Sequence, residues 1–318
     1  MEPLLQAKDL SVYYRTKRGP VHAVEGVSFD VALGETLGVV GETGCGKSTL
    51  GKAILGILPP GTKIKGALRF DGRDLLSIPP EGLREIRGKD VALVFQDPMT
   101  RLDPLFTIED HFVETIRAHE DVTRQAAIER ARAALASMGI PESRLRNYPH
   151  EFSGGMRQRI MIAMSLVLNP KLLVADEPTT SLDVIVEAQI LEILEDLKRA
   201  YKMSLLLITH NLAIVAEVCD RVAVMYAGKV VEIGGVRDVF KRPIHPYTQG
   251  LLASIIHLDS KGLYSIDGLP PDLVTPPPAC RFHPRCPHAQ EICHTKDPDW
   301  VEYRPGHFAA CHFGTDFL

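Results

Sequence analysis

A glycine-rich segment constrains this chain more than any other feature, because it places a glycine and four further residues directly before a Gly-Lys-Ser triplet. The segment runs Gly41-Glu42-Thr43-Gly44-Cys45-Gly46-Lys47-Ser48-Thr49. Residues 35–40 before it have the pattern of a buried strand, and residues 47–58 have the composition of a helix that ends before Pro59. A glycine-rich segment of this kind between a strand and a helix is typical of a phosphate-binding loop. In such a loop, backbone N–H groups surround an anion at the helix N-terminus. The segment therefore predicts an α/β fold that binds phosphate groups at the end of a strand.

The chemistry of this loop assigns roles to its side chains. Lys47 is expected to reach the β and γ phosphates of a nucleotide, and Ser48 to offer its hydroxyl to Mg²⁺. Contacts with ATP are expected from Gly41, Gly44, Cys45, Gly46, Lys47, Ser48 and Thr49. For Cys45 two interpretations stay open: a small residue that the loop tolerates, or a redox-sensitive thiol, since a helix N-terminus lowers the pKa of a thiol.

Two carboxylates follow a second apolar strand, which is expected over residues 171–175. Asp176 and Glu177 would then stand at the carboxyl end of that strand, where open α/β sheets bind ligands. Positioning and charge stabilisation dominate phosphoryl transfer, so we expect Asp176 to hold Mg²⁺ and Glu177 to polarise the water that attacks the γ-phosphorus. Two acids after a strand also occur as helix caps. Together with the phosphate-binding loop, however, they predict ATP hydrolysis.

A third segment, Glu151-Phe152-Ser153-Gly154-Gly155-Met156-Arg157-Gln158-Arg159, resembles the signature sequence that distinguishes ABC ATPases from other phosphate-loop enzymes. Phe152 and Met156 depart from the commoner Leu-Ser-Gly-Gly-Gln, and the form found here resembles one of the two ATPases of dipeptide and oligopeptide importers. A serine and two glycines that open a helix make a second phosphate-binding N-terminus. The resemblance implies a head-to-tail dimer, in which Ser153, Gly154 and Gly155 cover the ATP held by the partner's loop.

The resemblance also implies roles for residues outside these motifs. Gln96 resembles the glutamine that contacts Mg²⁺ and the γ-phosphate, and His210 resembles the switch histidine that contacts the γ-phosphate, so both join Lys47 and Glu177 as catalytic candidates. The segment Ser181-Leu182-Asp183 resembles the loop that joins the two sites of the dimer.

One of two adjacent tyrosines is expected to stack on the adenine ring. Strand alternation allows only Tyr13 or Tyr14 to point toward the nucleotide, and packing within the β-subdomain is the alternative for either. Alignment with the family favours Tyr14.

The fold class that these motifs predict is an α/β phosphate-loop ATPase core with an antiparallel β-subdomain, a helical insertion and a small C-terminal cysteine-rich extension. Short β-branched runs over residues 4–31 indicate the antiparallel strands, and the alternation of later strands and helices indicates a parallel sheet. A chain of 318 residues is long enough for one large domain and an appendage. We expect a nucleotide-binding domain at 1–240, with its helical subdomain at about 97–165, and the extension at 241–318.

Four of the six cysteines gather in that extension, with five, six and seventeen residues between successive cysteines. They are Cys280, Cys286, Cys293 and Cys311. In a reducing cytoplasm such a cluster is more often a metal site than a pair of disulfides, and four thiolates suit zinc or an iron–sulfur cluster equally well. Peptide-importer ATPases carry a similar extension, which in some members holds a [4Fe–4S] cluster. The resemblance therefore favours iron–sulfur and leaves zinc as the alternative.

Bulk properties limit the partners of the chain. A formal charge of −4 provides no general attraction to nucleic acid or anionic lipid, and no apolar stretch reaches the roughly 18 residues of a membrane span. The N-terminus has no charged leader before an apolar core, so no secretory signal is expected. The resemblance implies a peripheral ATPase at the cytoplasmic face of the cell membrane. Its implied partners are a sister ATPase in a heterodimer, two transmembrane permease subunits and, through these, an extracytoplasmic substrate-binding protein.

The expected cargo is dipeptides or oligopeptides, with oligosaccharides and metal chelates left open because specificity lies in other subunits. The main rival from another class is a soluble ABC-type ATPase that acts on nucleic acid or the ribosome. Such proteins carry paired cassettes, long coiled coils or a basic face, and this sequence has one cassette and a slightly acidic balance. A small-molecule kinase is the second rival, and the Ser-Gly-Gly signature disfavours it.

Overall fold

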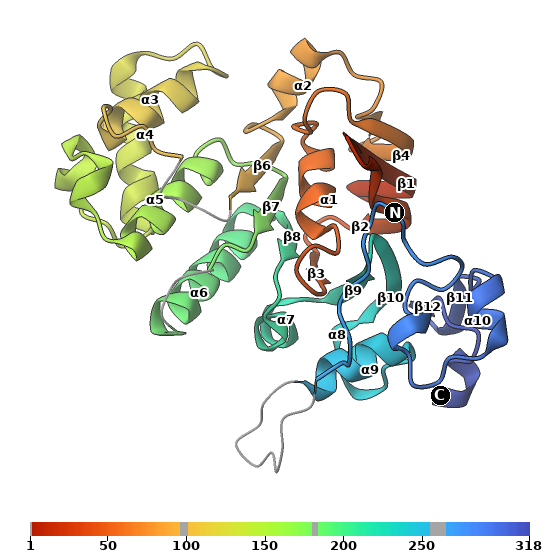
Figure 1. Ribbon diagram of the computed structural model, residues 1–318. Helices are drawn as coiled ribbons and strands as arrows, with labels where there is room; N and C mark the ends of the chain where they lie inside the picture. The colour runs from red at the N-terminus through yellow and green to blue at the C-terminus, as the bar shows by residue number, and fades with distance from the viewer. Residues whose placement is uncertain (1, 96–100, 180–183, 255–264) are drawn as a thin grey trace. The chain divides into compact units, whose positions relative to one another are not determined.

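The computed structural model describes residues 2–95, 101–179, 184–254 and 265–318 (Figure 1). The chain forms two compact units, of which the first comprises residues 1–77 and 207–318 and the second residues 78–206. In the described ranges, no helix combines the length and the apolar character that crossing a membrane requires.

The first unit begins with a four-stranded antiparallel sheet in the order β2-β1-β4-β5 (Figure 1). Its strands are β1 (Leu5–Thr16), β2 (Gly19–Val31), β4 (Lys63–Phe70) and β5 (Arg73–Asp74). β1 and β2 form a hairpin in which Thr16 pairs with Gly19 and Leu5 with Val31. The antiparallel strands predicted for residues 4–31 are therefore confirmed.

The first unit also contains five strands in the order β11-β12-β10-β9-β3. They are β3 (Thr36–Val40), β9 (Arg221–Tyr226), β10 (Lys229–Gly235), β11 (Val301–Arg304) and β12 (His307–Ala309). β3 pairs with β9 in parallel, as predicted, but β10, β12 and β11 continue in antiparallel fashion. The change of direction follows from the turn between β9 and β10, where Ala227 and Gly228 both have positive φ (48° and 85°) and let the chain reverse at once.

Residues of the C-terminal tail complete this unit. β12 pairs with β10 through Ile233 and Phe308, and the fully buried His307 Nε2 lies 2.7 Å from Oε1 of Glu232. Tyr226 of β9 packs its ring 4.6 Å from that of Tyr247 and 5.1 Å from that of Phe282. The tail thus shares the sheet and the hydrophobic core of the first unit.

The helices of the first unit are α1 (Lys47–Ile54), α7 (Leu212–Val218), α8 (Val236–Lys241), α9 (Pro246–Ala253) and α10 (Glu291–Thr295). The sequence predicted that α1 extends to residue 58, and this was wrong. Gly56 adopts φ 62°, and the N–H groups of Gly56 and Ile57 donate to the carbonyls of Ala53 and Lys52. A left-handed glycine with these bonds ends a helix, so α1 stops before Pro59 is reached.

The second unit pairs β6 (Val91–Val94) with β7 (Leu172–Asp176) in parallel. Its helices are α2 (Pro80–Ile86), α3 (Ile108–Arg117), α4 (Arg124–Ser137), α5 (Gly154–Leu166) and α6 (Val184–Tyr201), with 3₁₀ turns at Glu142–Arg146 and Pro149–Glu151. Side-chain caps begin three of these helices: Thr107 for α3, Thr123 for α4 and Ser153 for α5. β8 (Ser204–Ile208) carries the chain from the second unit into the first.

Candidate functional site

The glycine-rich loop joins β3 to α1, as predicted, and it lies against the backbone of two other strands. Gly46 has φ 107° directly before α1, and a Cβ there would lie 2.1 Å from the carbonyl oxygen of Ala23 in β2. A Cβ on Gly41 would lie 2.1 Å from the carbonyl oxygen of Met225 in β9. Strand carbonyls cannot retreat without breaking their ladder, so only glycine fits at either position. The two strands therefore determine the path of the loop.

Lys47 is the first residue of α1 and is only 5% exposed. Its ε-ammonium group donates to the carbonyl oxygens of Gly41, at 2.7 Å, and of Glu42, at 3.1 Å. Both acceptors are neutral, whereas a phosphate oxygen bound in the loop would offer a full negative charge to the same ammonium group. The role of Lys47 in phosphate binding stays a prediction.

Cys45 is buried within the loop at 5% exposure. Burial raises the pKa of its thiol, and the nearby Lys47 ammonium only partly opposes this effect. A reactive thiol needs a lowered pKa and access to solvent, and Cys45 has neither. Of the two interpretations left open by the sequence, the structure favours the small residue that the loop tolerates.

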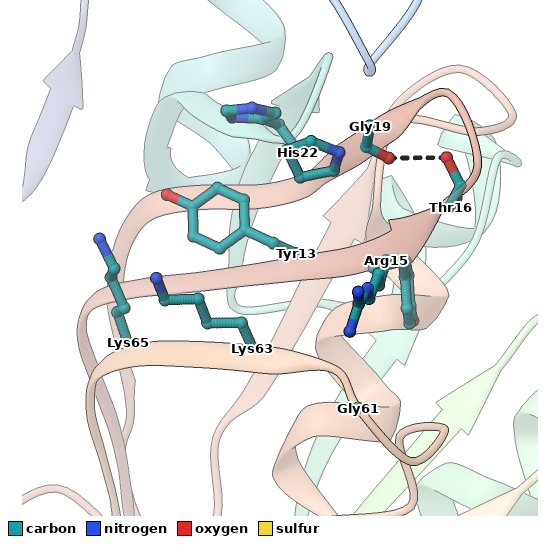
Figure 2. Close-up of a pocket in the computed structure, with 10 residues that line it drawn as sticks. Tyr13, Arg15, Thr16, Gly19, His22, Gly61, Lys63 and Lys65 are labelled. Carbon is teal, nitrogen blue, oxygen red and sulfur yellow. Dashed lines mark hydrogen bonds between the residues drawn. The ribbon is translucent and has the colours of Figure 1, made fainter.

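Tyr13 and Tyr14 point to opposite faces of β1. The Tyr14 hydroxyl donates to Oγ1 of Thr49 at 3.1 Å, which directs this side chain toward α1 and the phosphate-binding loop. The Tyr13 ring lies edge-on to His22 of β2, with centroids 4.9 Å apart, and the Lys65 ammonium is 5.9 Å from its centroid. Figure 2 shows Tyr13 with His22 on one side and the two lysines of β4 on the other.

An open pocket of about 600 Å³ lies at this end of the antiparallel sheet (Figure 2). It is lined by Tyr13, Tyr14, Arg15, Thr16, Gly19, Pro20, His22, Gly61, Lys63 and Lys65. Its volume falls in the range of small-molecule sites. Arg15, Lys63 and Lys65 were not among the residues predicted from the sequence. The two lysines come close to Tyr13 only because β4 pairs with β1.

His210 lies in the turn between β8 and α7 of the first unit. The N–H of the preceding Thr209 donates to the carbonyl oxygen of Val39 at 3.2 Å, so this turn follows β8 at the end of the sheet where the glycine-rich loop follows β3. Asn211 caps α7 by accepting the N–H of Ala213 at 3.1 Å. The exposed His210 thus lies between the buried Thr209 and the capped helix α7.

The carboxylates of the second motif lie in the second unit. Asp176 is the last residue of β7 and is 8% exposed. Glu177 follows with φ 48°, a conformation that is uncommon for a residue other than glycine and recurs at functional sites. The next residue, Pro178, accepts a hydrogen bond at its carbonyl oxygen from the side-chain amide of the buried Gln158 in α5.

The signature segment begins α5 of the same unit. Ser153 caps the helix, since its Oγ accepts the N–H of Met156 at 3.3 Å. A Cβ on Gly155 would lie 3.0 Å from a methyl group of Val186 in α6, whereas Gly154 has open space around it. The expected helix N-terminus is therefore formed, and the backbone of Gly154 is not covered by neighbouring side chains.

The residues expected at the ATP site belong partly to the first unit and partly to the second. The first contains the loop from Gly41 to Thr49, Tyr14 and His210, and the second contains Asp176, Glu177 and Ser153–Gly155. Gln96 and the segment Ser181-Leu182-Asp183 lie outside the described residues.

The four tail cysteines border one small cavity of about 20 Å³, together with His283, His288 and His312. Burial raises the pKa of Cys280 to about 11 and that of Cys311 to about 12, and the neighbouring cysteines add to the shift. Within the part of the chain that the structure describes, no three His, Cys, Asp or Glu side chains form a group that could hold a metal ion. The donors expected for a cluster thus share one cavity, but the expected metal site is not confirmed.

Comparisons with known proteins bear on both ends of the chain. The family model described as ABC transporter matches residues 24–180, and the model described as oligopeptide/dipeptide transporter, C-terminal region, matches residues 231–293. The oligopeptide transport ATP-binding protein OppD of Escherichia coli (strain K12) is 46% identical over 98% of this chain and 93% of its own length. The dipeptide transport ATP-binding protein DppD of Bacillus subtilis (strain 168) is 47% identical over 98% of this chain and 95% of its own length.

Solved structures show the same fold. An ATP-binding cassette whose dimer was solved in a post-hydrolysis state with ADP and Pi aligns with a TM-score of 0.66 and 24% identity, over 73% of this chain and 99% of that one. The protein cbiO1 of Clostridium perfringens, described as part of an ABC transporter complex, aligns with a TM-score of 0.65 and 28% identity, over 77% of this chain and 93% of that one. These matches show that the chain has the fold of an ATP-binding cassette.

Proposed function

Because the chain belongs to the ATP-binding proteins of oligopeptide and dipeptide ABC transporters, we propose that the residues predicted for its ATP site bind and hydrolyse ATP. The chain is the ATP-binding subunit of a peptide ABC importer, in which ATP hydrolysis is coupled to transport. The observation that carries the proposal is the buried Lys47 ammonium, which lies in a loop where Gly41 and Gly46 leave no room for a side chain.

The first unit would bind the nucleotide. The N–H groups of the glycine-rich loop and the Lys47 ammonium would surround the phosphates, since these are the donors that the loop and the start of α1 present. Tyr14 would stack on adenine from the face of β1 that is turned toward α1. His210 would contact the γ-phosphate from the end of β8.

The hydrolytic step would need a Mg²⁺ site and a residue that orients the attacking water. Ser48, Asp176 and Gln96 would hold Mg²⁺, which supplies neutralisation of the negative charge on the phosphates. Glu177 would accept a hydrogen bond from the attacking water and orient it toward the γ-phosphorus. Ser153, Gly154 and Gly155 would close over the nucleotide of a second ATPase subunit, so that ATP joins the two subunits.

The partners follow from this role. An ATP-binding subunit of a peptide importer works with permeases in the membrane. We propose two permease subunits, a sister ATPase that completes a heterodimer, a substrate-binding protein on the other side of the membrane, and a peripheral position at the cytoplasmic face. The relatives are named for oligopeptides and dipeptides, which favours peptides over oligosaccharides or metal chelates as cargo.

The domain division between residues 240 and 241, with a helical subdomain at about 97–165, stays a prediction.

The tail cysteines are proposed to bind an iron–sulfur cluster, with zinc as the alternative. The support is that four thiols of the right kind border one buried cavity, although its volume of about 20 Å³ requires the side chains to move apart. Anaerobic purification followed by iron, sulfide and zinc analysis tests this. Iron and sulfide that are both lost in Cys293→Ala would support the cluster. Zinc without iron or sulfide would support the alternative. A protein that contains none of the three would refute both proposals.

The hydrolytic assignment is tested by two substitutions. Glu177→Gln is expected to bind ATP and dimerise but to lose turnover by on the order of a hundredfold or more, because it removes the proposed water-orienting carboxylate. Lys47→Ala is expected to lose ATP binding itself. Glu195→Gln, at an exposed position of α6, is the matched control and should turn over normally. Normal turnover by Glu177→Gln would refute the role of Glu177.

A further inference from the structure

Arg285 lies in the tail directly before Cys286, yet its side chain reaches the phosphate-binding loop. Its Nη1 lies 2.7 Å from Oε2 of Glu42, and its Nη2 lies 3.0 Å from Oε1 of the same carboxylate. Two parallel bonds of this kind form the strongest and most directional type of arginine–carboxylate pair. Glu42 is the second residue of the loop, so the pair joins segments that are far apart in the sequence.

The guanidinium group of Arg285 uses all of its donors at this place. Nη1 also donates to the hydroxyl of Tyr226 at 3.3 Å, while Nη2 and Nε donate to the carbonyl oxygens of Ile266, at 3.2 Å, and of Asp267, at 2.9 Å. Five bonds account for the five N–H groups of an arginine, and the side chain is only 6% exposed. A lysine, with one point charge and no planar fork, could not replace it.

A second tail residue holds the backbone of the same loop residue. The N–H of Glu42 donates to the hydroxyl oxygen of Tyr247 in α9 at 3.0 Å. Tyr247 is fully buried and packs against Tyr226, and burial raises the pKa of its hydroxyl, which therefore stays protonated. Both the side chain and the backbone of Glu42 are thus held by the tail.

The charge of Glu42 makes this contact important for an anionic ligand. A carboxylate in a loop that binds phosphates repels them unless a cation neutralises it, and charges in a partly buried site are weakly screened. Arg285 supplies that cation and fixes the carboxylate at the rim of the loop, one residue after the Gly41 carbonyl that accepts a bond from Lys47.

We propose that Arg285 and Tyr247 are positioning residues through which the C-terminal tail controls ATP affinity, by neutralising and holding Glu42 in the phosphate-binding loop. The inference rests on the proposed function, namely that this loop binds ATP. It assigns the tail a role in the ATPase cycle that does not depend on whether its cysteines hold a metal.

The test is equilibrium binding of a fluorescent ATP analogue, with Mg²⁺, to the full chain. Arg285→Met is expected to raise the dissociation constant about three- to thirtyfold, because it leaves Glu42 charged and unpaired. Glu42→Gln in the Arg285→Met background should recover most of the lost affinity, because the uncharged side chain no longer repels the phosphates. A general structural defect would not be rescued in this way. In turnover assays the KM for ATP should change more than kcat.

Two results would overturn the inference: wild-type affinity in Arg285→Met, or a double variant that binds no better than Arg285→Met. Arg18→Met is the matched control, since Arg18 pairs with Asp272 of the tail at an exposed site, and its ATP affinity should be unchanged. If Arg285→Met does not fold, Tyr247→Phe replaces it, because this change removes only the hydroxyl that accepts from Glu42. Wild-type affinity in Tyr247→Phe would then overturn the inference.

Lys47→Ala distinguishes this inference from the proposed function. Normal ATP binding by Lys47→Ala would refute the proposed site itself. Loss of binding in Lys47→Ala together with wild-type binding in Arg285→Met would refute only the role of the tail.

Discussion

The buried side-chain amide of Gln158 donates a hydrogen bond to the carbonyl oxygen of Pro178, which joins helix α5 to the loop that carries Glu177. α5 is the helix that Ser153 caps, so the signature segment and the proposed water-orienting carboxylate are connected within one unit. Glu177 has a left-handed backbone conformation, which persists only where the surrounding structure holds it. The bond from Gln158 is one such restraint.

Replacing Gln158 by leucine should therefore affect both stability and turnover. The change keeps the volume but leaves the buried Pro178 carbonyl without this donor, which costs about 1–3 kcal/mol of the free energy of unfolding. We expect kcat for ATP hydrolysis to fall while ATP affinity is largely kept, as measured by steady-state kinetics and denaturant unfolding. Gln125→Leu, which removes an exposed bond to Glu129, is the control and should change neither. Unchanged kcat in Gln158→Leu would show that this restraint does not position Glu177.

Gly46→Ala should abolish ATP binding. The added Cβ would lie 2.1 Å from the Ala23 carbonyl, and φ 107° is unfavourable for alanine, so the loop must move away from β2. Gly72→Ala is the matched control, because Gly72 also has a positive φ (75°) but open space around it. The control should lose about 1 kcal/mol of unfolding free energy and keep its ATP affinity. Equal ATP affinity in the two variants would argue against the loop as the ATP site.

Tyr14 and Tyr13 should differ in their effect on nucleotide binding. Tyr14→Ala removes the proposed stacking face and should weaken ATP binding by about 1–3 kcal/mol, whereas Tyr13→Ala should have a smaller effect because its ring packs against His22. Competition by inorganic tripolyphosphate, which has no base to stack, should be the same in wild type and Tyr14→Ala. The opposite ranking of the two alanine variants would assign the adenine to the Tyr13 face.

The thiol of Cys45 should react only at unusually alkaline pH. Burial raises its pKa above the ordinary thiol value of about 8.5. Near that pH, a smaller fraction of Cys45 is therefore thiolate in the folded chain than in the unfolded chain. Its contribution to stability is therefore complete below about pH 8.5 and is lost as the pH rises through the folded-state pKa. Alkylation rates at Cys45, followed by peptide mass spectrometry against pH, should show a higher midpoint in the native than in the denatured protein. A native midpoint below the denatured one would restore the interpretation as a reactive thiol.

Local patterns were sufficient for much of the fold and of the candidate site. The strand that ends before the glycine-rich loop and the strand that ends at Asp176 lie where the sequence predicted them, and Ser153 begins α5 as a capping serine. Such features depend on neighbouring residues, since hydrophobic periodicity and caps act within one or two turns of chain. The end of α1 also depends on a local signal, because Gly56 ends the helix before Pro59, from which the sequence predicted its end.

The contacts made by the tail could not be predicted in the same way. The sequence predicted an appendage at residues 241–318, but β12 adds to the edge of β10, and Tyr247 and Phe282 enter the core of the first unit. Strand pairing and side-chain packing between distant segments follow from the arrangement of the whole chain. Four cysteines in one segment predicted a metal site, and whether a metal is bound there depends on side-chain positions that spacing does not specify.

The sequence by itself determined that Gly41 to Thr49 forms a strand–loop–helix suited to phosphate, because the glycines, the lysine and the flanking periodicity are local. It also determined the kinship of the chain, through the segment from Glu151 to Arg159. Only the tertiary structure decided that Gly41 and Gly46 are excluded from bearing side chains, because the obstructing carbonyls belong to Met225 and Ala23. It alone decided that Arg285 neutralises Glu42, because a contact between such distant residues exists only when the tail folds back onto the loop.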